Sequence, residues 1–209
     1  MTLVVVDTFN HRVFSDTRIT HRYDEEYLSN DIFTYTFKSI LNRKIRKNFS
    51  WGISERFIDD YQKIRPCGRL LIFGAGDALE VSRFRQSLLN KKPTKVKDKN
   101  TVVYCVYKKP SGNLRTYRFT MGKVEVFDSF DYSMDKKYFY LSSGSGSSAF
   151  NGAIDYIVDN EFGGDKIKAF SDLDTIRKAF QTVIKNNTDQ YTGGEVVEVN
   201  LNNRMDMFE

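Results

Sequence analysis

Short apolar segments separated by turn residues follow one another along the chain, and this pattern predicts strands. The first two are predicted at 2–6 and 12–15, with Asn10 and His11 in the turn between them. The others are predicted at 69–73, 101–107, 113–120, 123–128, 138–141 and 195–201. Residues 32–37 alternate partly like a strand, whereas the basic segment 40–58 is predicted to be helical or irregular.

Three longer segments repeat their apolar residues with helical spacing instead. The first begins after Asp77, the second covers 149–159, and the third covers 172–185 with Asp172 as its N-terminal cap. The residues expected to face the core are Leu79, Phe84, Leu88 and Leu89 in the first helix, Phe150, Ile154, Ile157 and Val158 in the second, and Leu173, Ile176, Phe180 and Ile184 in the third. Strands, a helix, strands, two helices and a strand in this order predict an α+β fold, with helices for both outer faces of a two-sheet sandwich.

Length and composition fit a single globular domain over residues 1–209. The chain has 209 residues, of which 40% are hydrophobic and 14% aromatic, and this composition excludes a disordered chain. The net charge is +5, and much of the positive charge lies in 43–47 and 91–99, with Trp51 shortly after the first run. A basic nucleic-acid-binding module would have this pattern, but solvated loops and helix faces explain it more simply. We therefore expect no nucleic acid as a partner.

Cysteine and histidine content and hydropathy narrow the class of protein further. Two cysteines and two histidines are too few for a disulfide framework or a zinc site, so we expect no metal and no cofactor. The low cysteine content fits the reducing cytoplasm. The apolar start of the chain meets Asp7 at once, so it is too short for a signal peptide, and no apolar run is long enough to span a bilayer. We expect a cytoplasmic protein that makes no membrane contact.

Candidate chemistry begins at Thr2. Removal of Met1 would leave a threonine whose free amine and hydroxyl belong to one residue, so that a nucleophile and its base arrive together. The apolar strand behind it would hold this terminus in place. Four later segments combine the end of a strand or helix with small or polar residues, and each by itself fits an ordinary turn. They are 15–18 (Ser-Asp-Thr-Arg), 74–77 (Gly-Ala-Gly-Asp), 143–146 (Ser-Gly-Ser-Gly) and 189–194 (Asp-Gln-Tyr-Thr-Gly-Gly).

In this order behind Thr2, the four segments resemble the proteasome β-type family of N-terminal nucleophile hydrolases and the related bacterial proteasome-like peptidases. The Ser-Asp-x-Arg-x-Thr motif matches 15–20, the Ala-Gly strand end matches 75–76, the Gly-Ser-Gly turn matches 144–146, and Asp-x-x-Ser-Gly matches 189–193 with threonine in place of serine. The resemblance implies a four-layer αββα sandwich of two mostly antiparallel sheets. The segment between Asp16 and Gly76 is longer than usual in the family, which predicts an insertion within 20–62.

The resemblance also implies a role for each matched residue. Thr2 would attack a peptide carbonyl through its side-chain oxygen. Asp16 would keep a lysine charged, and that lysine would promote ionisation of the hydroxyl or relay its proton. The backbone N–H of Gly76 would stabilise the oxyanion. The free amine would be surrounded by Ser145 and Asp189 with support from Thr192, and the substrate pocket would be lined by Gly74 and Ala78.

Two lysines are candidates for the catalytic one. The family places it on the strand before the Ala-Gly strand, where Lys63 fits if the turn at 66–68 is slightly shortened. Lys38 is the alternative, and we favour Lys63.

The resemblance implies partners as well. It calls for a homo-oligomer such as a ring of like subunits, for a peptide or unfolded protein as substrate, and for an ATP-dependent unfoldase that delivers it. A small-molecule amide would suit the same machinery. If Met1 stays in place, Thr2 has no free amine, and the alternative is a catalytically inactive structural or assembly subunit of the same fold.

Overall fold

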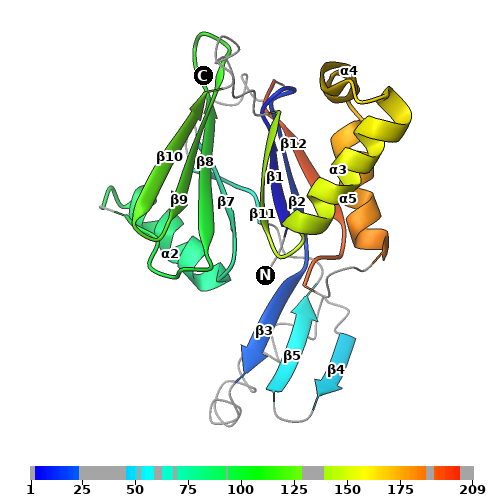
Figure 1. Ribbon diagram of the computed structural model, residues 1–209. Coiled ribbons are helices and arrows are strands. Elements are labelled where there is room, and N and C mark those ends of the chain that lie inside the picture. Colours follow the sequence, from blue (N-terminus) through cyan, green and yellow to red (C-terminus); the bar gives the residue numbers. More distant parts are fainter. Residues whose placement is uncertain are drawn as a thin grey trace.

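Two antiparallel sheets and the helices packed on them form the larger part of the structure (Figure 1). The computed structural model describes residues 3–23, 46–50, 53–58, 63–67, 70–92, 94–128, 139–186 and 191–202. The strand predicted at 32–37 lies outside these ranges. The described elements make this an α+β fold, as the order of elements in the sequence predicts.

The first sheet carries the N-terminal strands. It contains β1 (Leu3–Asp7), β2 (Arg12–Asp16), β11 (Tyr140–Gly144) and β12 (Val196–Asn200) in the order β11-β1-β2-β12, and all its pairs are antiparallel. β1 and β2 confirm the predicted pair of strands and are buried throughout. β11 begins later than predicted and continues to Gly144, because Ser143 and Gly144 pair with Val4 and Leu3 of β1.

The second sheet is formed by the middle of the chain. It contains β6 (Arg65–Cys67), β7 (Leu70–Ala75), β8 (Val102–Lys108), β9 (Leu114–Thr120) and β10 (Lys123–Asp128) in the order β10-β9-β8-β7-β6. β7 confirms the strand predicted at 69–73 but continues through Ala75, because Gly74 and Ala75 pair with Val103 and Val102. β8, β9 and β10 agree with the predicted strands to within one residue at each end.

A third, smaller sheet corrects one prediction. It contains β3 (Ile19–Tyr23), β4 (Arg46–Ser50) and β5 (Ile53–Ile58) in the order β3-β5-β4, and Figure 1 shows it beyond one end of the first sheet. The helical or irregular structure predicted for 40–58 is therefore wrong over β4 and β5. The arginines, lysine and glutamate of these strands have good helix propensity, but antiparallel pairing of β5 with both neighbours decides the local structure instead. This sheet lies in the part of the chain where the sequence predicts an insertion.

Four helices cover the outer faces of the two larger sheets within the described residues. They are α2 (Ala78–Leu89), α3 (Ser147–Phe162), α4 (Lys166–Ser171) and α5 (Thr175–Asn186). α2 begins after Asp77, whose side chain caps it by accepting a hydrogen bond from the Leu79 amide. In Figure 1, α3 and α5 lie side by side against the first sheet, and α2 lies against the second.

The helix predicted at 172–185 is shorter than expected at its start. α5 begins at Thr175, and Asp172 lies in the connection from α4, where its carboxylate accepts hydrogen bonds from the Asp174 amide and the Thr175 hydroxyl. Leu173, predicted to face the core, is 59% exposed because it precedes the helix. Leu79 and Leu89 of α2 are also exposed, since they lie at its two ends beyond the contact with the sheet.

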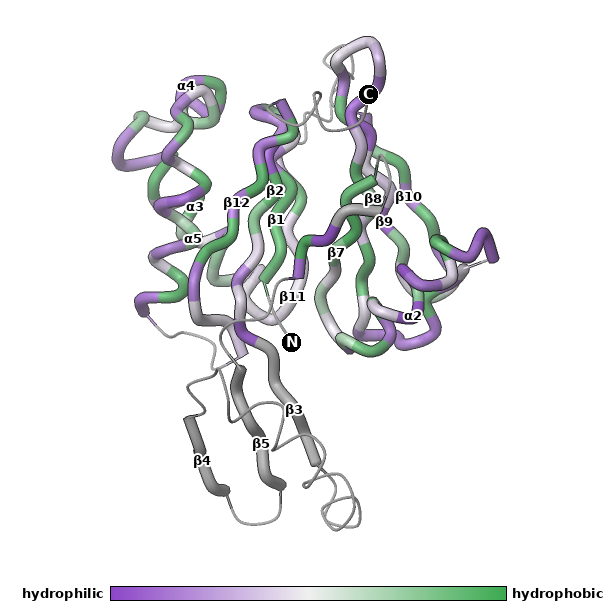
Figure 2. Tube along the Cα trace, turned by 180° about the vertical axis from the view of Figure 1, so that it is seen from behind, coloured by the Kyte–Doolittle hydropathy of each residue, from purple (hydrophilic) through white to green (hydrophobic). Residues whose placement is uncertain are grey.

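Three clusters of buried side chains connect these elements. In β1, Leu3 and Val5 pack with Phe150 and Phe180 of the helices, whereas Val4 and Val6 pack with residues of the second sheet. In β7, Leu71, Phe73 and Ala75 share that inter-sheet cluster, and Ile72 packs with Phe84 of α2. Both strands are apolar on both faces because both faces are covered, and Figure 2 shows these apolar stretches in green. The two sheets therefore share one core cluster, and helices pack on the far side of each.

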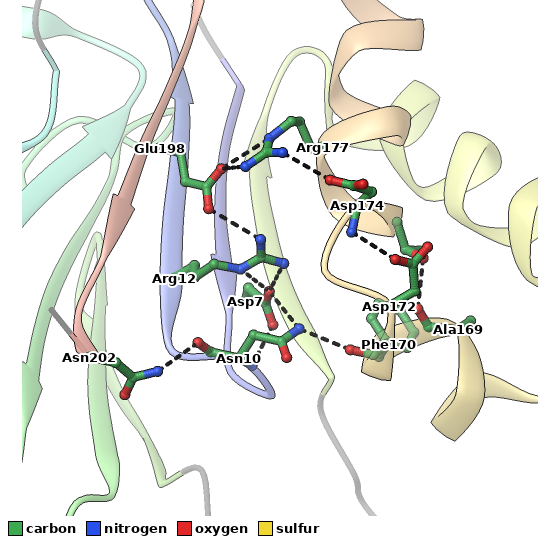
Figure 3. A network of polar contacts seen from close by, with 11 residues as sticks. Asp7, Asn10, Arg12, Ala169, Phe170, Asp172, Asp174, Arg177, Glu198 and Asn202 are labelled. Carbon is green, nitrogen blue, oxygen red and sulfur yellow. Dashed lines mark hydrogen bonds and ion pairs between the residues drawn. The ribbon is translucent and has the colours of Figure 1, made fainter.

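A network of charged groups joins the first sheet to α5 at the end of β2 away from Asp16 (Figure 3). Arg12 donates to Asp7 Oδ2 from Nε at 3.0 Å and from Nη2 at 2.8 Å, and the two side chains are 3% and 0% exposed. Arg12 Nη1 also donates to Glu198 Oε1 at 3.1 Å, and the other oxygen of Glu198 accepts from Arg177 of α5. Burial raises the pKa of Asp7 against the lowering effect of these hydrogen bonds.

Replacing Arg12 with methionine is expected to lower the free energy of unfolding by about 3 to 5 kcal/mol, because Asp7 would stay buried without its cation. The loss should shrink as the pH falls, since a buried carboxyl stops destabilising the fold once it takes up a proton. Arg177→Met is the matched control, because its side chain is 45% exposed, and its loss should not exceed about 1 kcal/mol. Urea denaturation at pH 7 and pH 5 measures both variants, and equal losses would contradict this account.

Candidate active site

One buried carboxylate joins three distant segments of the chain. Asp16, at the end of β2, is fully buried. Its Oδ1 accepts hydrogen bonds from Lys63 Nζ at 2.6 Å and from the Leu3 amide at 3.0 Å, and its Oδ2 accepts from the Gly193 amide at 3.1 Å. The start of β1, the segment just before β6 and the segment before β12 therefore meet at Asp16.

The ion pair between Asp16 and Lys63 spans the two larger sheets. Ile64 is buried in the inter-sheet cluster, and β6 pairs with β7, so Lys63 is fixed at the beginning of the second sheet. The side chains of the pair are 5% exposed for Lys63 and 0% for Asp16. Removing two charges from water has a desolvation cost that apolar residues of similar size would avoid. A buried pair of this kind is a candidate for a functional role rather than a device for stability.

Next to these contacts, the turn after β11 packs against the start of β1 and the segment before β12. A Cβ atom on Gly146 would lie 2.7 Å from Thr192 Oγ1 and 3.3 Å from Leu3 Cβ, so this glycine allows the turn to pack against both residues. Thr192 is 1% exposed. The neighbouring Ser145 has a buried hydroxyl for which the described residues supply no hydrogen-bond partner. Ser15 Oγ on β2 is the other buried hydroxyl without such a partner among the described residues.

Three predicted site residues, Thr2, Asp189 and the alternative lysine Lys38, lie outside the described residues. Thr2 is attached by its peptide bond to the Leu3 nitrogen that donates to Asp16. Asp189 belongs to the same short segment as Thr192 and Gly193. The chain therefore leads from Leu3 directly to Thr2, and Asp189 lies four residues before Gly193 in the sequence.

Gly74, within β7, and Gly76, just after it, have different surroundings. Gly76 has φ +112, and a Cβ there would lie 2.5 Å from Thr101 Oγ1 and 2.6 Å from Thr101 Cα. Only glycine fits this position, which leads directly into α2. A Cβ on Gly74 would lie 2.5 Å from the Val102 carbonyl oxygen and 2.8 Å from Val81 Cγ2, so Gly74 packs tightly between β8 and α2. Ala78 is exposed in the first turn of α2, and the pocket expected at Gly74 and Ala78 stays a prediction.

The structure adds polar residues that the sequence analysis missed. Tyr104 Oη on β8 lies 2.6 Å from Ser143 Oγ on β11, which joins the two sheets next to Val4. Burial raises the pKa of Tyr104, against the lowering effect of its hydrogen bond with Ser143. Nothing in the sequence distinguishes this tyrosine from the other apolar residues of its strand. Arg18 was also missed, although it stands in the same matched segment as Asp16.

Comparisons with known proteins leave the family open. No model of a protein family matches the sequence, and no curated protein is similar to it. In the part of the chain that the structure describes, no helix has the length and apolar character needed to cross a bilayer. No group of three or more histidine, cysteine or acidic side chains among those residues is arranged to hold a metal ion. The contacts of the buried Asp16 carboxylate are therefore the main evidence for a function.

Proposed function

We propose that this chain is a proteasome-like threonine peptidase with the four-layer αββα fold of N-terminal nucleophile hydrolases. Thr2, exposed by removal of Met1, is the nucleophile. The observation that carries the proposal is the buried pair of Asp16 and Lys63, whose carboxylate also binds the amide of Leu3. The order of layers supports the fold, since α3 and α5, the first sheet, the second sheet and α2 share three successive core clusters.

The chemistry follows from placing a free threonine at this point. Thr2 Oγ attacks the carbonyl carbon of a peptide bond and passes its proton to the free amine of the same residue, while the ammonium group of Lys63, which Asp16 holds in position, promotes ionisation of the hydroxyl. The leaving amine takes up the proton, and an ester links the acyl group of the substrate to Thr2. Water then attacks the ester, which releases the carboxylic acid and restores the hydroxyl. No cofactor is needed for this sequence of steps.

The remaining residues stabilise and orient this nucleophile. The N–H of Gly76 donates to the oxyanion, and one such donor is worth about 2.7 to 4 kcal/mol of barrier. The buried hydroxyl of Ser145, which needs a partner, binds the Thr2 amine together with Asp189. Thr192 supports that contact through its packing against Gly146. Ala78 and Gly74 would border the pocket for the residue before the cleaved bond.

The same proposal extends to assembly. A homo-oligomer, such as a ring of like subunits, would enclose the active threonines, and an ATP-dependent unfoldase would deliver unfolded protein to them. Analytical ultracentrifugation measures directly whether the chain forms a homo-oligomer.

Hydrolysis of a set of fluorogenic peptides tests the proposed activity. We expect the wild-type chain to release the fluorophore, and Thr2→Ala to lose at least about 1,000-fold in rate while keeping its unfolding midpoint. Intact mass, measured on the same samples, reports whether Met1 is removed. Equal rates for the two proteins would overturn the assignment of Thr2. Retained Met1 with no hydrolysis would favour the inactive structural subunit.

A further inference from the structure

Arg18 lies against the segment that precedes β12. Its amide donates to the Gly193 carbonyl at 3.1 Å, and the neighbouring Thr17 amide donates to the Glu195 carbonyl at the same distance. The Thr17 hydroxyl in turn accepts from the Glu195 amide at 2.9 Å. Residues 16–18 and 193–195 are therefore joined side by side just beyond the end of the first sheet.

The side chain of Arg18 packs directly on Gly193. A Cβ on Gly193 would lie 2.6 Å from Arg18 Nη1 and 2.8 Å from Arg18 Nε, and closer still to Cζ. The guanidinium group thus occupies the space that any side chain at 193 would need. The backbone of Gly193 does not have a positive φ, whereas that of Gly194 does. Because these atoms are the far end of a flexible side chain, a Cβ at 193 would displace the guanidinium group rather than the backbone.

Gly193 is held by Arg18 and by Asp16 at once. Its carbonyl accepts from the Arg18 amide, and its own amide donates to Asp16 Oδ2 at 3.1 Å. That hydrogen bond leaves Oδ1 of Asp16 to accept from Lys63 and Leu3. A shift of Gly193 would therefore turn the carboxylate that holds Lys63. It would also move Thr192, which packs against Gly146.

We infer that Arg18 is a positioning residue of this site, whose guanidinium, packed on Gly193, fixes the Asp16 carboxylate and through it Lys63. The effect on reaction rate rests on the proposed function, but the effect on the Asp16 carboxylate does not. Arginine suits the role because its planar group can lie flat on a backbone and stays charged at every relevant pH. A lysine side chain has no planar group to place there.

A set of four variants tests the inference through activity. Arg18→Ala and Gly193→Ala are each expected to lower kcat for peptide hydrolysis by about 10- to 100-fold with KM unchanged, because Asp16 is displaced but the substrate pocket is not. The double variant should be no slower than the slower single variant, since both changes remove the same contact. Low millimolar guanidinium should restore part of the rate of Arg18→Ala. It should not restore Gly193→Ala, where the new Cβ fills the space.

Two control variants make the same substitutions, arginine to alanine and glycine to alanine, away from the site. Arg83→Ala, on the exposed face of α2, and Gly152→Ala, whose Cβ would meet nothing within 4 Å, should both keep the wild-type rate. Additive losses in the double variant, or rescue of Gly193→Ala by guanidinium, would overturn the inference.

Amide hydrogen exchange tests the same inference without any activity. The amides of Leu3 and Gly193 both donate to Asp16, so Arg18→Ala should speed exchange at both by at least about tenfold. Arg83→Ala should leave both unchanged. Unchanged exchange at Leu3 in Arg18→Ala would overturn the positioning role even if the protein hydrolyses peptides. Faster exchange at both amides in a protein without hydrolysis would support the positioning role and overturn the proposed function alone.

Discussion

Lys63→Met is expected to abolish peptide hydrolysis, with a loss of at least about 100-fold in rate. The charged amine of Lys63 lies 2.6 Å from Asp16 Oδ1 and is the group proposed to promote ionisation of the Thr2 hydroxyl. The same change should lower the free energy of unfolding by about 3 to 5 kcal/mol, because the buried carboxylate of Asp16 would lose its ion pair with Lys63. Fluorogenic peptide assays and urea denaturation measure the two losses separately.

A double variant separates loss of function from loss of fold. Lys63→Met combined with Asp16→Asn removes the buried charge, so part of the lost stability should return while hydrolysis stays absent. Lys38→Met is the second comparison, because Lys38 is the alternative lysine of the sequence analysis. It should hydrolyse at the wild-type rate. Hydrolysis that survives Lys63→Met but not Lys38→Met would assign the catalytic role to the other lysine.

Gly76→Ala is expected to destabilise the fold by about 3 to 5 kcal/mol. Its φ of +112 strains any other residue by about 1 to 3 kcal/mol. In addition, the new Cβ would lie 2.6 Å from Thr101 Cα and 2.7 Å from the Asn100 carbonyl oxygen, and backbone atoms cannot move aside as a flexible side chain can. Relief of this overlap would displace the turn between β7 and α2, so hydrolysis should fall as well.

Gly112→Ala is the matched control for that prediction. Gly112 also has a positive φ, +87, but a Cβ there would meet nothing within 4 Å. It should therefore show the conformational strain alone, at most about 3 kcal/mol, and keep full activity. Chemical denaturation compares the two variants. A loss for Gly112→Ala as large as that for Gly76→Ala would mean that backbone strain, and not the contact with Thr101, requires the glycine.

Most of the elements of the two larger sheets could be predicted, because their strands and helices carry apolar residues with the spacing typical of each. β1, β7 and the helix after Asp77 are examples. The strands β4 and β5 could not be predicted, since their charged residues give no strand pattern and pairing alone determines them. The start of α5 was predicted too early. Aspartate is a residue type that often caps helices, but Asp172 lies in the connection before α5, where its carboxylate accepts a hydrogen bond from the Asp174 amide.

The sequence predicted which residues belong to the candidate site, but not the contacts between them. The order of the four matched segments indicated Asp16 and a lysine, and left Lys63 and Lys38 open. The ion pair that favours Lys63 crosses from the second sheet to the first and depends on β6 pairing with β7, which the sequence does not specify. Arg18 was missed because its effect comes from the absence of a side chain at Gly193, and Tyr104 because its partner Ser143 lies on the other sheet.

The most direct test of the central claim is mass mapping of the N-terminal peptide after treatment with an epoxyketone, an electrophile that reacts with an amine and a hydroxyl on the same residue. We predict that Met1 is absent, that one molecule of probe is attached to Thr2, and that Lys63→Met greatly slows this attachment. A peptide that still begins with Met1 and carries no probe would contradict the account.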